Sequence, residues 1–275
     1  MRIKRGGPAV AGLALSLGAL VACGTGGGSG DAAQPPTAGA TSPAGAEQQR
    51  SASPDASSPL DGKVIVIDPG HNGGNADHPD EINKQVKIGN GSKACDTTGT
   101  STDDGYSEHA FTWDVSKRLE KALEAEGAEV TLTRDSDDGV GPCITERAGI
   151  ANKLKADAAL SVHADGTSAS GHGFHIIAPE SIGRNAAVVP ASRDLGLALR
   201  DAFKEGTGVP YSNYLGEKGM DFRDDLGGLN MSTVPKVFLE AGNMRNADEA
   251  AKMKDPRFRE RIADSLAQGF ERYFA

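Results

Sequence analysis

The sequence predicts an α/β fold: a single layered domain in which helices flank both faces of a twisted, mostly parallel or mixed sheet. Two observations predict it. Short apolar runs that end in glycine, proline or polar residues recur along residues 61–275, and amphipathic stretches of helical period separate them. Such alternation is typical of layered α/β sheets, and the segment is long enough for one domain with its own core.

Six expected elements lie before residue 180. Residues 63–68 (KVIVID) form an apolar run that ends at Pro-Gly, which indicates a buried strand. Over residues 108–127, apolar side chains including Phe111 and Val115 recur on one helical stripe, and Gly127 ends the helix. The other expected elements are a strand at 128–133, a helix at 144–155, and strands at 158–162 and 173–178.

The rest of the chain predicts three more elements. Residues 191–205 have the pattern of a helix, and we expect the glycine-rich stretch from there to Asn230 to be irregular. Residues 236–240 (KVFLE) indicate a last strand, and residues 255–273 a closing helix. Sites in open α/β sheets gather beyond the carboxyl ends of the strands, so the chemistry is expected there.

Residues 1–22 have the features of a lipoprotein signal peptide. A basic start with Arg2, Lys4 and Arg5 precedes an apolar run of about 15 residues, shorter than the roughly 20 that span a bilayer. The run ends in Leu-Val-Ala-Cys, which resembles a bacterial lipobox and predicts lipidation of Cys23. The alternatives are a transmembrane anchor, or a soluble secreted protein with an ordinary cleavage site near Cys23.

Residues 23–60 consist almost entirely of Gly, Ala, Ser, Pro, Thr and Gln with a few charges, so we expect a disordered tether. Its r.m.s. reach of roughly 30–35 Å would hold a folded domain clear of a membrane surface. The protein is therefore expected in the cell envelope. It would be anchored to the outer face of the cytoplasmic membrane through the lipid at Cys23, or released outside the cell.

The chain has three cysteines, so lipidation of Cys23 would leave an even pair, Cys95 and Cys143. In an exported protein such a pair most often forms a disulfide. Two free thiols or a metal site with sulfur ligands are the alternatives, although no Cys-x-x-Cys spacing favours a metal there.

The charge balance is acidic. The formal net charge is −9, and removal of the three basic residues of the signal would make it −12 (−9 − 3). Nothing indicates a basic surface for nucleic acid or another anionic polymer. Any anionic substrate must be held by local groups.

Polar residues follow three of the expected strands. Asp68-Pro-Gly-His71 follows the first, His163 comes at the end of the third, and Glu240 ends the last. Two histidines and a carboxylate at one edge of a sheet can converge on a metal. Zinc accepts nitrogen and oxygen ligands, and a catalytic zinc site leaves one position for water.

A third ligand is expected from Glu108, which begins the first long helix. It lies three and seven residues before Phe111 and Val115, on the stripe that packs against the sheet. A buried carboxylate there is unfavourable unless it is paired or bound to a metal. His109 is the competing candidate, about 100° off that stripe. Taken singly, a histidine after a strand or a glutamate at a helix start is commonly an ordinary structural residue.

Taken together, these residues resemble the zinc-dependent N-acetylmuramoyl-L-alanine amidases of the third amidase family. The resemblance rests on Asp68-Pro-Gly-His71, Glu108, Ser161-Val-His163 and Leu239-Glu240, in the order of the family. It extends to Thr133-Arg134-Asp135, Arg147-Ala-Gly-Ile-Ala-Asn152 and Leu229-Asn-Met-Ser-Thr-Val-Pro235, and it covers residues 63–275.

The resemblance implies a role for each matching residue. His71, Glu108 and His163 would bind Zn²⁺, and Glu240 would be the catalytic carboxylate. The reaction implied is hydrolysis of the amide bond between N-acetylmuramic acid and L-alanine, in peptidoglycan or its fragments. Residues 61–275 would then be the catalytic domain.

The segment 72–106 departs from the shortest family members, which pass from the histidine to the glutamate in fewer residues. A Cys95–Cys143 disulfide would link this excursion, residues 72–106, to the loop before the second helix. The longer segment 72–106 does not change the predicted ligands, but it leaves the shape of the substrate cleft open.

Four further residues are weaker candidates. Arg147 and Arg223 could stabilise an oxyanion, but a structural or substrate-positioning role is expected of each. His172 and His175 could form a second metal pair. Their spacing of three places them on opposite faces of a strand, so we expect cleft-lining or surface residues instead.

Two other functions remain open at this point. A zinc peptidase or deacetylase could use the same ligands, and mass spectrometry of digested muropeptides would distinguish either from an amidase. A non-catalytic wall-binding lipoprotein could keep the fold, but a missing ligand or a missing Glu240 would be expected of it. We expect a monomer, and the sequence leaves both intact wall and soluble fragments open as substrates.

Overall fold

The computed structural model describes residues 57–275. The predicted signal peptide over residues 1–22, the lipidated Cys23 and the predicted tether up to residue 56 lie outside the described residues. Within the described part, no helix combines the length and the apolar character that a bilayer crossing requires.

A six-stranded mixed sheet forms the centre of the domain, in the order β4-β1-β5-β8-β6-β7. Its strands are β1 (Val64–Pro69), β4 (Glu129–Leu132), β5 (Ala158–Asp165), β6 (His175–Pro179), β7 (Met220–Arg223) and β8 (Lys236–Asn243). All neighbouring strands are parallel except β6 and β8, which are antiparallel. The predicted fold class is confirmed.

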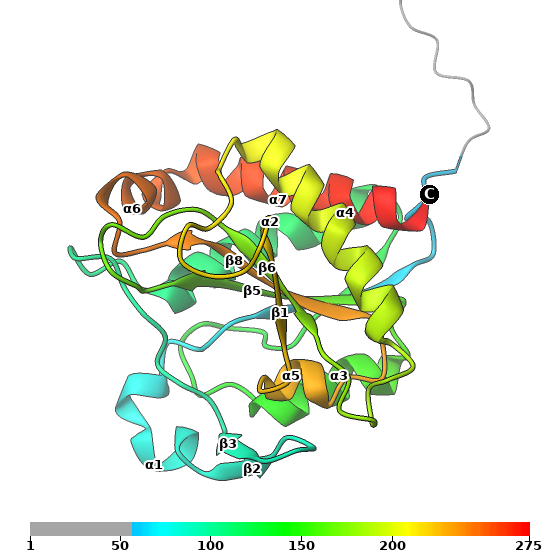
Figure 1. Cartoon of the computed structure of the whole chain (residues 1–275), viewed down its shortest axis with the longest axis horizontal. Coiled ribbons are helices and arrows are strands. Elements are labelled where there is room, and N and C mark those ends of the chain that lie inside the picture. The colour runs from blue at the N-terminus through cyan, green and yellow to red at the C-terminus, as the bar shows by residue number, and fades with distance from the viewer. Residues whose placement is uncertain (1–56) are drawn as a thin grey trace, which may run out of the picture. The chain divides into compact units, whose positions relative to one another are not determined.

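Helices cover both faces of this sheet (Figure 1). One face carries α2 (Glu108–Ala125), α4 (Val189–Thr207) and α7 (Pro256–Phe274), and the other carries α3 (Ile144–Leu154) and α5 (Gly227–Asn230). A sixth helix, α6 (Ala247–Lys254), follows β8 directly. The chain thus forms three layers, as expected when a largely parallel sheet has two apolar faces to bury.

The apolar stripe of α2 shows why this helix packs as it does. Phe111, Val115, Leu119 and Leu123 recur at intervals of four residues and are all fully buried. Burial of each such side chain contributes about 1.5–3 kcal/mol. Because Glu108 opens the same stripe, the packing that buries these side chains also turns its carboxylate toward the sheet.

Three features of the chain differ from the sequence-based expectation. The stretch expected to be irregular contains the short helix α5 and the strand β7, which is four residues long and has only two apolar side chains. The helix α6 was not predicted; the Asn246 side chain caps it by accepting from the Glu249 N–H at 3.2 Å. Leu60, expected at the end of the tether, is fully buried in the core, so the fold begins before residue 61.

The excursion between β1 and α2 folds into small elements of its own. These are η1 (Asn75–Asp77), α1 (Pro79–Ile82), and a hairpin of β2 (Gln85–Lys87) and β3 (Ser92–Ala94). The predicted Cys95–Cys143 disulfide is present and joins the residue after β3 to the residue before α3. The excursion is therefore tied to the face of the sheet that carries α3 and α5 (Figure 1).

Candidate metal and catalytic site

The three polar strand ends meet at one edge of the sheet, because β1, β5 and β8 are neighbours. Asp68 pairs with Ser161, and His163 pairs with Glu240. His71 follows β1 with a φ of 62°, a left-handed conformation that non-glycine residues seldom adopt and that often marks functional sites.

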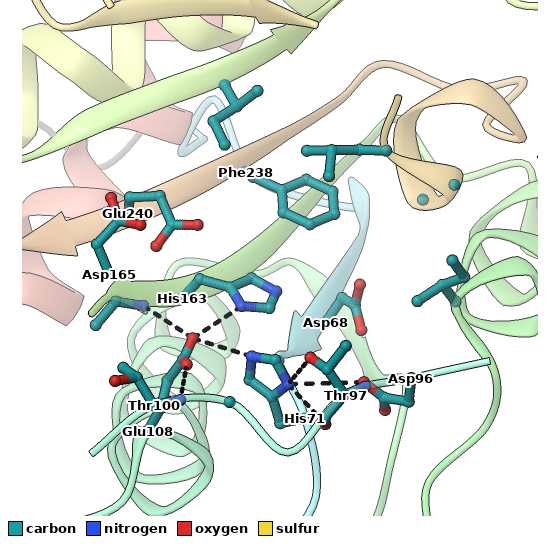
Figure 2. Close-up of a pocket in the computed structure, with 18 of the residues that line it drawn as sticks. Asp68, His71, Asp96, Thr97, Thr100, Glu108, His163, Asp165, Phe238 and Glu240 are labelled. Carbon is teal, nitrogen blue, oxygen red and sulfur yellow. Dashed lines mark hydrogen bonds and ion pairs between the residues drawn. The ribbon is translucent and has the colours of Figure 1, made fainter. Parts of the chain in front are cut away.

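His71, Glu108 and His163 converge there as the residues that could hold a metal ion. The Oε1 atom of Glu108 lies 3.1 Å from Nε2 of His71 and 3.0 Å from Nδ1 of His163. One ligand atom from each residue lies within 4.8 Å of the other two. Figure 2 shows the Glu108 carboxylate with dashed lines to both imidazoles.

Glu108 is only 4% exposed, and backbone groups fix both of its oxygens. Oε2 accepts from the Thr100 N–H at 2.9 Å, and Oε1 accepts from the Ala164 N–H at 3.2 Å. Burial by itself would raise the pKa of Glu108. The two histidines outweigh it and hold the pKa below its ordinary value, so the carboxylate is ionised.

The competing candidate at the helix start does not join this group. His109 contacts Asp137 instead, with 2.8 Å between Nδ1 and Oδ2. Arg134, from the strand-end segment Thr133-Arg134-Asp135, contacts the same Asp137 at 2.9 Å and bonds the Pro69 carbonyl at 3.1 Å. These residues brace the turn after β1 from outside the site.

The surroundings of His71 orient its ring. Nδ1 lies 3.0 Å from the Thr97 carbonyl and 3.6 Å from Asp96, which leaves Nε2 to face Glu108. Such a bond from one ring nitrogen fixes the tautomer in which the other can bind a metal. Burial would lower the pKa of His71, but Glu108 and Asp96 raise it to about 10. The carboxylates of Glu108 and Asp96 thus stabilise a positive charge on the His71 ring.

The donor set fits zinc. Two nitrogens and one carboxylate oxygen form a catalytic set of the kind that zinc takes, and tetrahedral bonds of about 2.0–2.1 Å would place ligand atoms roughly 3.3 Å apart. Two glycines permit the close packing. A Cβ on Gly70 would overlap the His163 ring, and one on Gly99 would lie 2.8 Å from Cδ2 of His71.

Glu240 stands beside this group. It is partly buried on β8, next to His163 in register, and Figure 2 shows its carboxylate close to that of Asp165. Burial, followed by the Asp165 and Glu108 carboxylates, raises the pKa of Glu240 well above its ordinary value. A carboxyl group with a raised pKa can both take up and release a proton near neutral pH.

Asp68 anchors the floor of the site. Its two oxygens accept from four side chains, which come from strands β5 and β8, helix α3 and the residue after β4: Thr133 at 2.7 Å, Ser161 at 2.6 Å, Arg147 at 3.1 Å and Lys236 at 3.0 Å. Burial would raise the pKa of Asp68, but Lys236 and Arg147 lower it well below its ordinary value. Sequence reasoning missed Lys236, because a lysine at the start of a strand usually points to solvent.

Arg147 is part of the same network and is 3% exposed. Besides Asp68 it contacts Asp96 at 3.0 Å, and its Nη atoms bond the carbonyls of Pro69 at 2.8 Å and His71 at 3.1 Å. Each of its guanidinium nitrogens therefore has a protein acceptor. This arrangement favours the structural role over contact with a substrate.

The two histidines of the segment Gly171-His-Gly-Phe-His175 lie in different environments. His172 is exposed and contacts Asn213. His175 was expected to line a cleft or the surface, and that expectation is wrong, since it is fully buried in β6 beside Glu240. Strand pairing on both sides of β6 buries it, and a single-sequence pattern does not contain that information.

A pocket of about 550 Å³ opens over these groups. It extends from the three converging residues past Phe238 and Ile177 to Arg223 at the end of β7 and Lys93 on the hairpin. Arg223 bonds Asp225 through Nε at 2.7 Å and Nη2 at 2.8 Å. Of the two arginines singled out from the sequence, this one is accessible.

The chain is similar to known cell-wall enzymes. A family model described as N-acetylmuramoyl-L-alanine amidase matches residues 65–272. An N-acetylmuramoyl-L-alanine amidase of Mycobacterium tuberculosis is 42% identical over 217 residues, covering 78% of this chain and 87% of that protein. The probable cell wall amidase LytH of Staphylococcus aureus is 28% identical over 220 residues, covering 79% of this chain and 60% of LytH.

Among solved structures, the N-acetylmuramyl-L-alanine amidase Ami1 of Mycobacterium smegmatis aligns with a TM-score of 0.74 and 40% identity. The alignment covers 78% of this chain and 98% of Ami1. The part that aligns is the layered domain, and the elements that carry the converging residues lie within the matched segment.

Proposed function

The chain belongs to the N-acetylmuramoyl-L-alanine amidase family, and from that premise we propose that it cuts peptidoglycan with a zinc ion held by His71, Glu108 and His163. The bond hydrolysed is the amide between N-acetylmuramic acid and L-alanine. The observation that carries the zinc proposal is the convergence of these three side chains within 4.8 Å, next to Glu240 and in an open pocket.

Each residue has a distinct task in this proposal. Zinc in such a set lowers the pKa of a bound water and polarises an amide carbonyl. Glu240 accepts a proton from the attacking water and delivers it to the leaving nitrogen, which its raised pKa favours. His71 is held in its orientation by Thr97, and Glu108 by two backbone N–H groups, so the set needs little rearrangement.

The test uses a Glu240→Gln variant and purified muropeptides. Wild type should release intact sugars and intact peptides that begin with L-alanine, as measured by mass spectrometry. Chelation should abolish this release, and added zinc should restore it. The Glu240→Gln variant should keep about one zinc per chain and lose about 10²–10⁴ in rate, the usual contribution of a positioned acid–base group.

Glu129→Gln, an exposed carboxylate on the far edge strand β4, is the matched control and should keep the wild-type rate. Loss of zinc from Glu240→Gln would make Glu240 a ligand and contradict the assigned roles. Cleavage between amino acids would indicate a peptidase, and release of acetate a deacetylase. Full activity of a metal-free wild type would contradict the zinc proposal.

The cellular location is part of the same proposal. We infer export through the signal over residues 1–22, attachment through a lipid at Cys23, and a tether that begins at Cys23, ends before Leu60 and lets the domain reach the wall. The basis is the sequence pattern together with a family whose substrate is extracellular. A monomer is sufficient, because one chain supplies every group that the proposed mechanism uses.

A further inference from the structure

The pocket is long in one direction, along the strands. Glu240 pairs with His175 on β6, and four residues further along β6, Pro179 pairs with Arg223 on β7. Four strand residues correspond to about 13 Å. Arg223 therefore marks the end of the pocket opposite the reactive groups, with the side chains of Phe238 and Ile177 between.

The two ends of this pocket differ in their charged groups. The carboxylates of Glu108, Asp165 and Glu240 surround the reactive end. At the other end, Arg223 and Lys93 share a single carboxylate, that of Asp225, with Lys93 Nζ at 2.9 Å from Oδ2. Asp221 also lies close enough to act on Arg223, so this end combines two cations with the carboxylates of Asp225 and Asp221.

Donors remain available there. Within residues 57–275, Nη1 of Arg223 has no hydrogen-bond partner, and Lys93 Nζ uses one N–H, on Asp225. The Arg223 and Lys93 side chains are 34% and 39% exposed, so a ligand can reach them. Asp225 already occupies Nε and Nη2 of Arg223, so a ligand carboxylate would bind through Nη1 of Arg223 and through Lys93 Nζ.

We propose that Arg223 and Lys93 form a subsite for a carboxylate on the peptide side of the substrate, on the second residue after the cleaved bond. This inference rests on the proposed function. Two extended residues span about 7 Å, and an acidic side chain adds the remaining reach. An acidic protein with a formal net charge of −9 repels an anionic peptide in general, so this local pair decides which peptides bind.

The experiment measures binding in the Glu240→Gln protein, which should hold the peptide without cutting it. The probes are N-acetylmuramoyl-L-alanyl-D-glutamate and the same compound with one or both carboxyl groups amidated, titrated by calorimetry at fixed salt. The diacid should bind roughly fivefold to tenfold more tightly than the diamide. The two monoamides identify which carboxylate is recognised.

Variants then assign this preference to the subsite. Arg223→Gln should remove the preference by weakening the binding of the diacid only. Arg223→Lys should keep part of the preference, because the charge stays and the Nη1 donor is lost. Lys93→Gln should reduce it. Lys87→Gln, on the same hairpin and exposed, is the matched control and should leave it unchanged. In the wild-type background the Arg223→Gln change should raise KM for the diacid and leave kcat within about twofold.

The outcomes separate the two proposals. Equal affinity for diacid and diamide in the Glu240→Gln protein, or equal weakening of both by Arg223→Gln, would overturn the subsite. A preference for the diacid that depends on Arg223, in a protein whose wild type cleaves no muramoyl amide, would support the subsite and overturn the amidase activity.

Discussion

His175 is a buried imidazole that the proposed mechanism does not use. Among the described residues neither of its ring nitrogens has a hydrogen-bond partner, and the nearest carboxylate, that of Asp165, is 3.8 Å from Nδ1. Burial and the positive charge of Arg223 lower the pKa of His175 from 6.5 to about 4. The ring is therefore neutral in the folded protein at neutral pH.

This pKa predicts a pH dependence of the free energy of unfolding. Between pH 6.5 and about 4 the unfolded chain binds a proton at His175 and the folded chain does not, so acid destabilises the fold. The stabilisation is complete above pH 6.5. About 3 kcal/mol is lost as the pH falls to 4, at 1.36 kcal/mol per unit of pKa difference.

A His175→Leu variant isolates this contribution from the other groups that titrate in the same range. Urea unfolding of both proteins at intervals between pH 4 and 7 should give curves that diverge. The wild type should lose stability toward acid and the variant should lose less. Parallel curves would show that the folded state accepts the proton as readily as the unfolded chain does.

At the scale of elements, the excursion between β1 and α2 determines how His71 is held. Cys95 follows β3, and the next two residues, Asp96 and Thr97, both face the His71 ring. The disulfide to Cys143 fixes this segment against the start of α3, where the Ile144 N–H also donates to the Cys95 carbonyl at 2.8 Å. We therefore expect the disulfide to support both the stability of the fold and the proposed metal binding.

A Cys95→Ser/Cys143→Ser double variant should show both effects. The bridge spans a sequence separation of 48 residues, and the chain-entropy relation gives about 4 kcal/mol of stabilisation for such a loop. We expect the free energy of unfolding in urea to fall by about 2–4 kcal/mol. Zinc affinity, from competition with a chelating dye, should fall by up to about tenfold, because the support of His71 loosens.

A thiol reductant provides the control for this pair. It should destabilise the wild type by a similar amount and leave the double variant unchanged. Unchanged zinc affinity in a destabilised double variant would show that the bridge stabilises the fold without supporting the His71 ring.

At the scale of the whole chain, the proposed lipid at Cys23 separates location from catalysis. The folded domain begins near Leu60, and the catalytic groups all lie beyond residue 67. Cys23→Ala should therefore move the protein from the membrane fraction to the soluble or medium fraction. Its specific activity on muropeptides should stay at the wild-type value, since no group of the site is touched.

Fractionation and detergent phase partitioning measure this change. A protein that remains in the membrane pellet after Cys23→Ala would be held by something other than the lipid. A lower specific activity of the released protein would show that the segment before residue 57 contributes to the reaction. Ser57→Ala, next to the folded domain, is the matched control and should remain in the membrane fraction.

The α/β class, most of the helices and strands, and the converging residues could all be predicted from local signals in the sequence. The period of the α2 stripe places Glu108 on the buried side, and the run KVIVID leads to Asp68 and His71 at a strand end. These features depend on neighbours within a few residues. Interactions between residues that are close in the sequence are therefore sufficient to predict these features.

Only the tertiary structure decided the partners of those residues. Lys236 reaches Asp68 across 168 positions of the chain, and Arg147 bonds the carbonyls of Pro69 and His71. β7 exists because β6 offers it a pairing edge, and His175 is buried because the neighbouring strands and Tyr214 enclose it. Each of these depends on strand register and on which elements become neighbours, and the folded chain as a whole sets both.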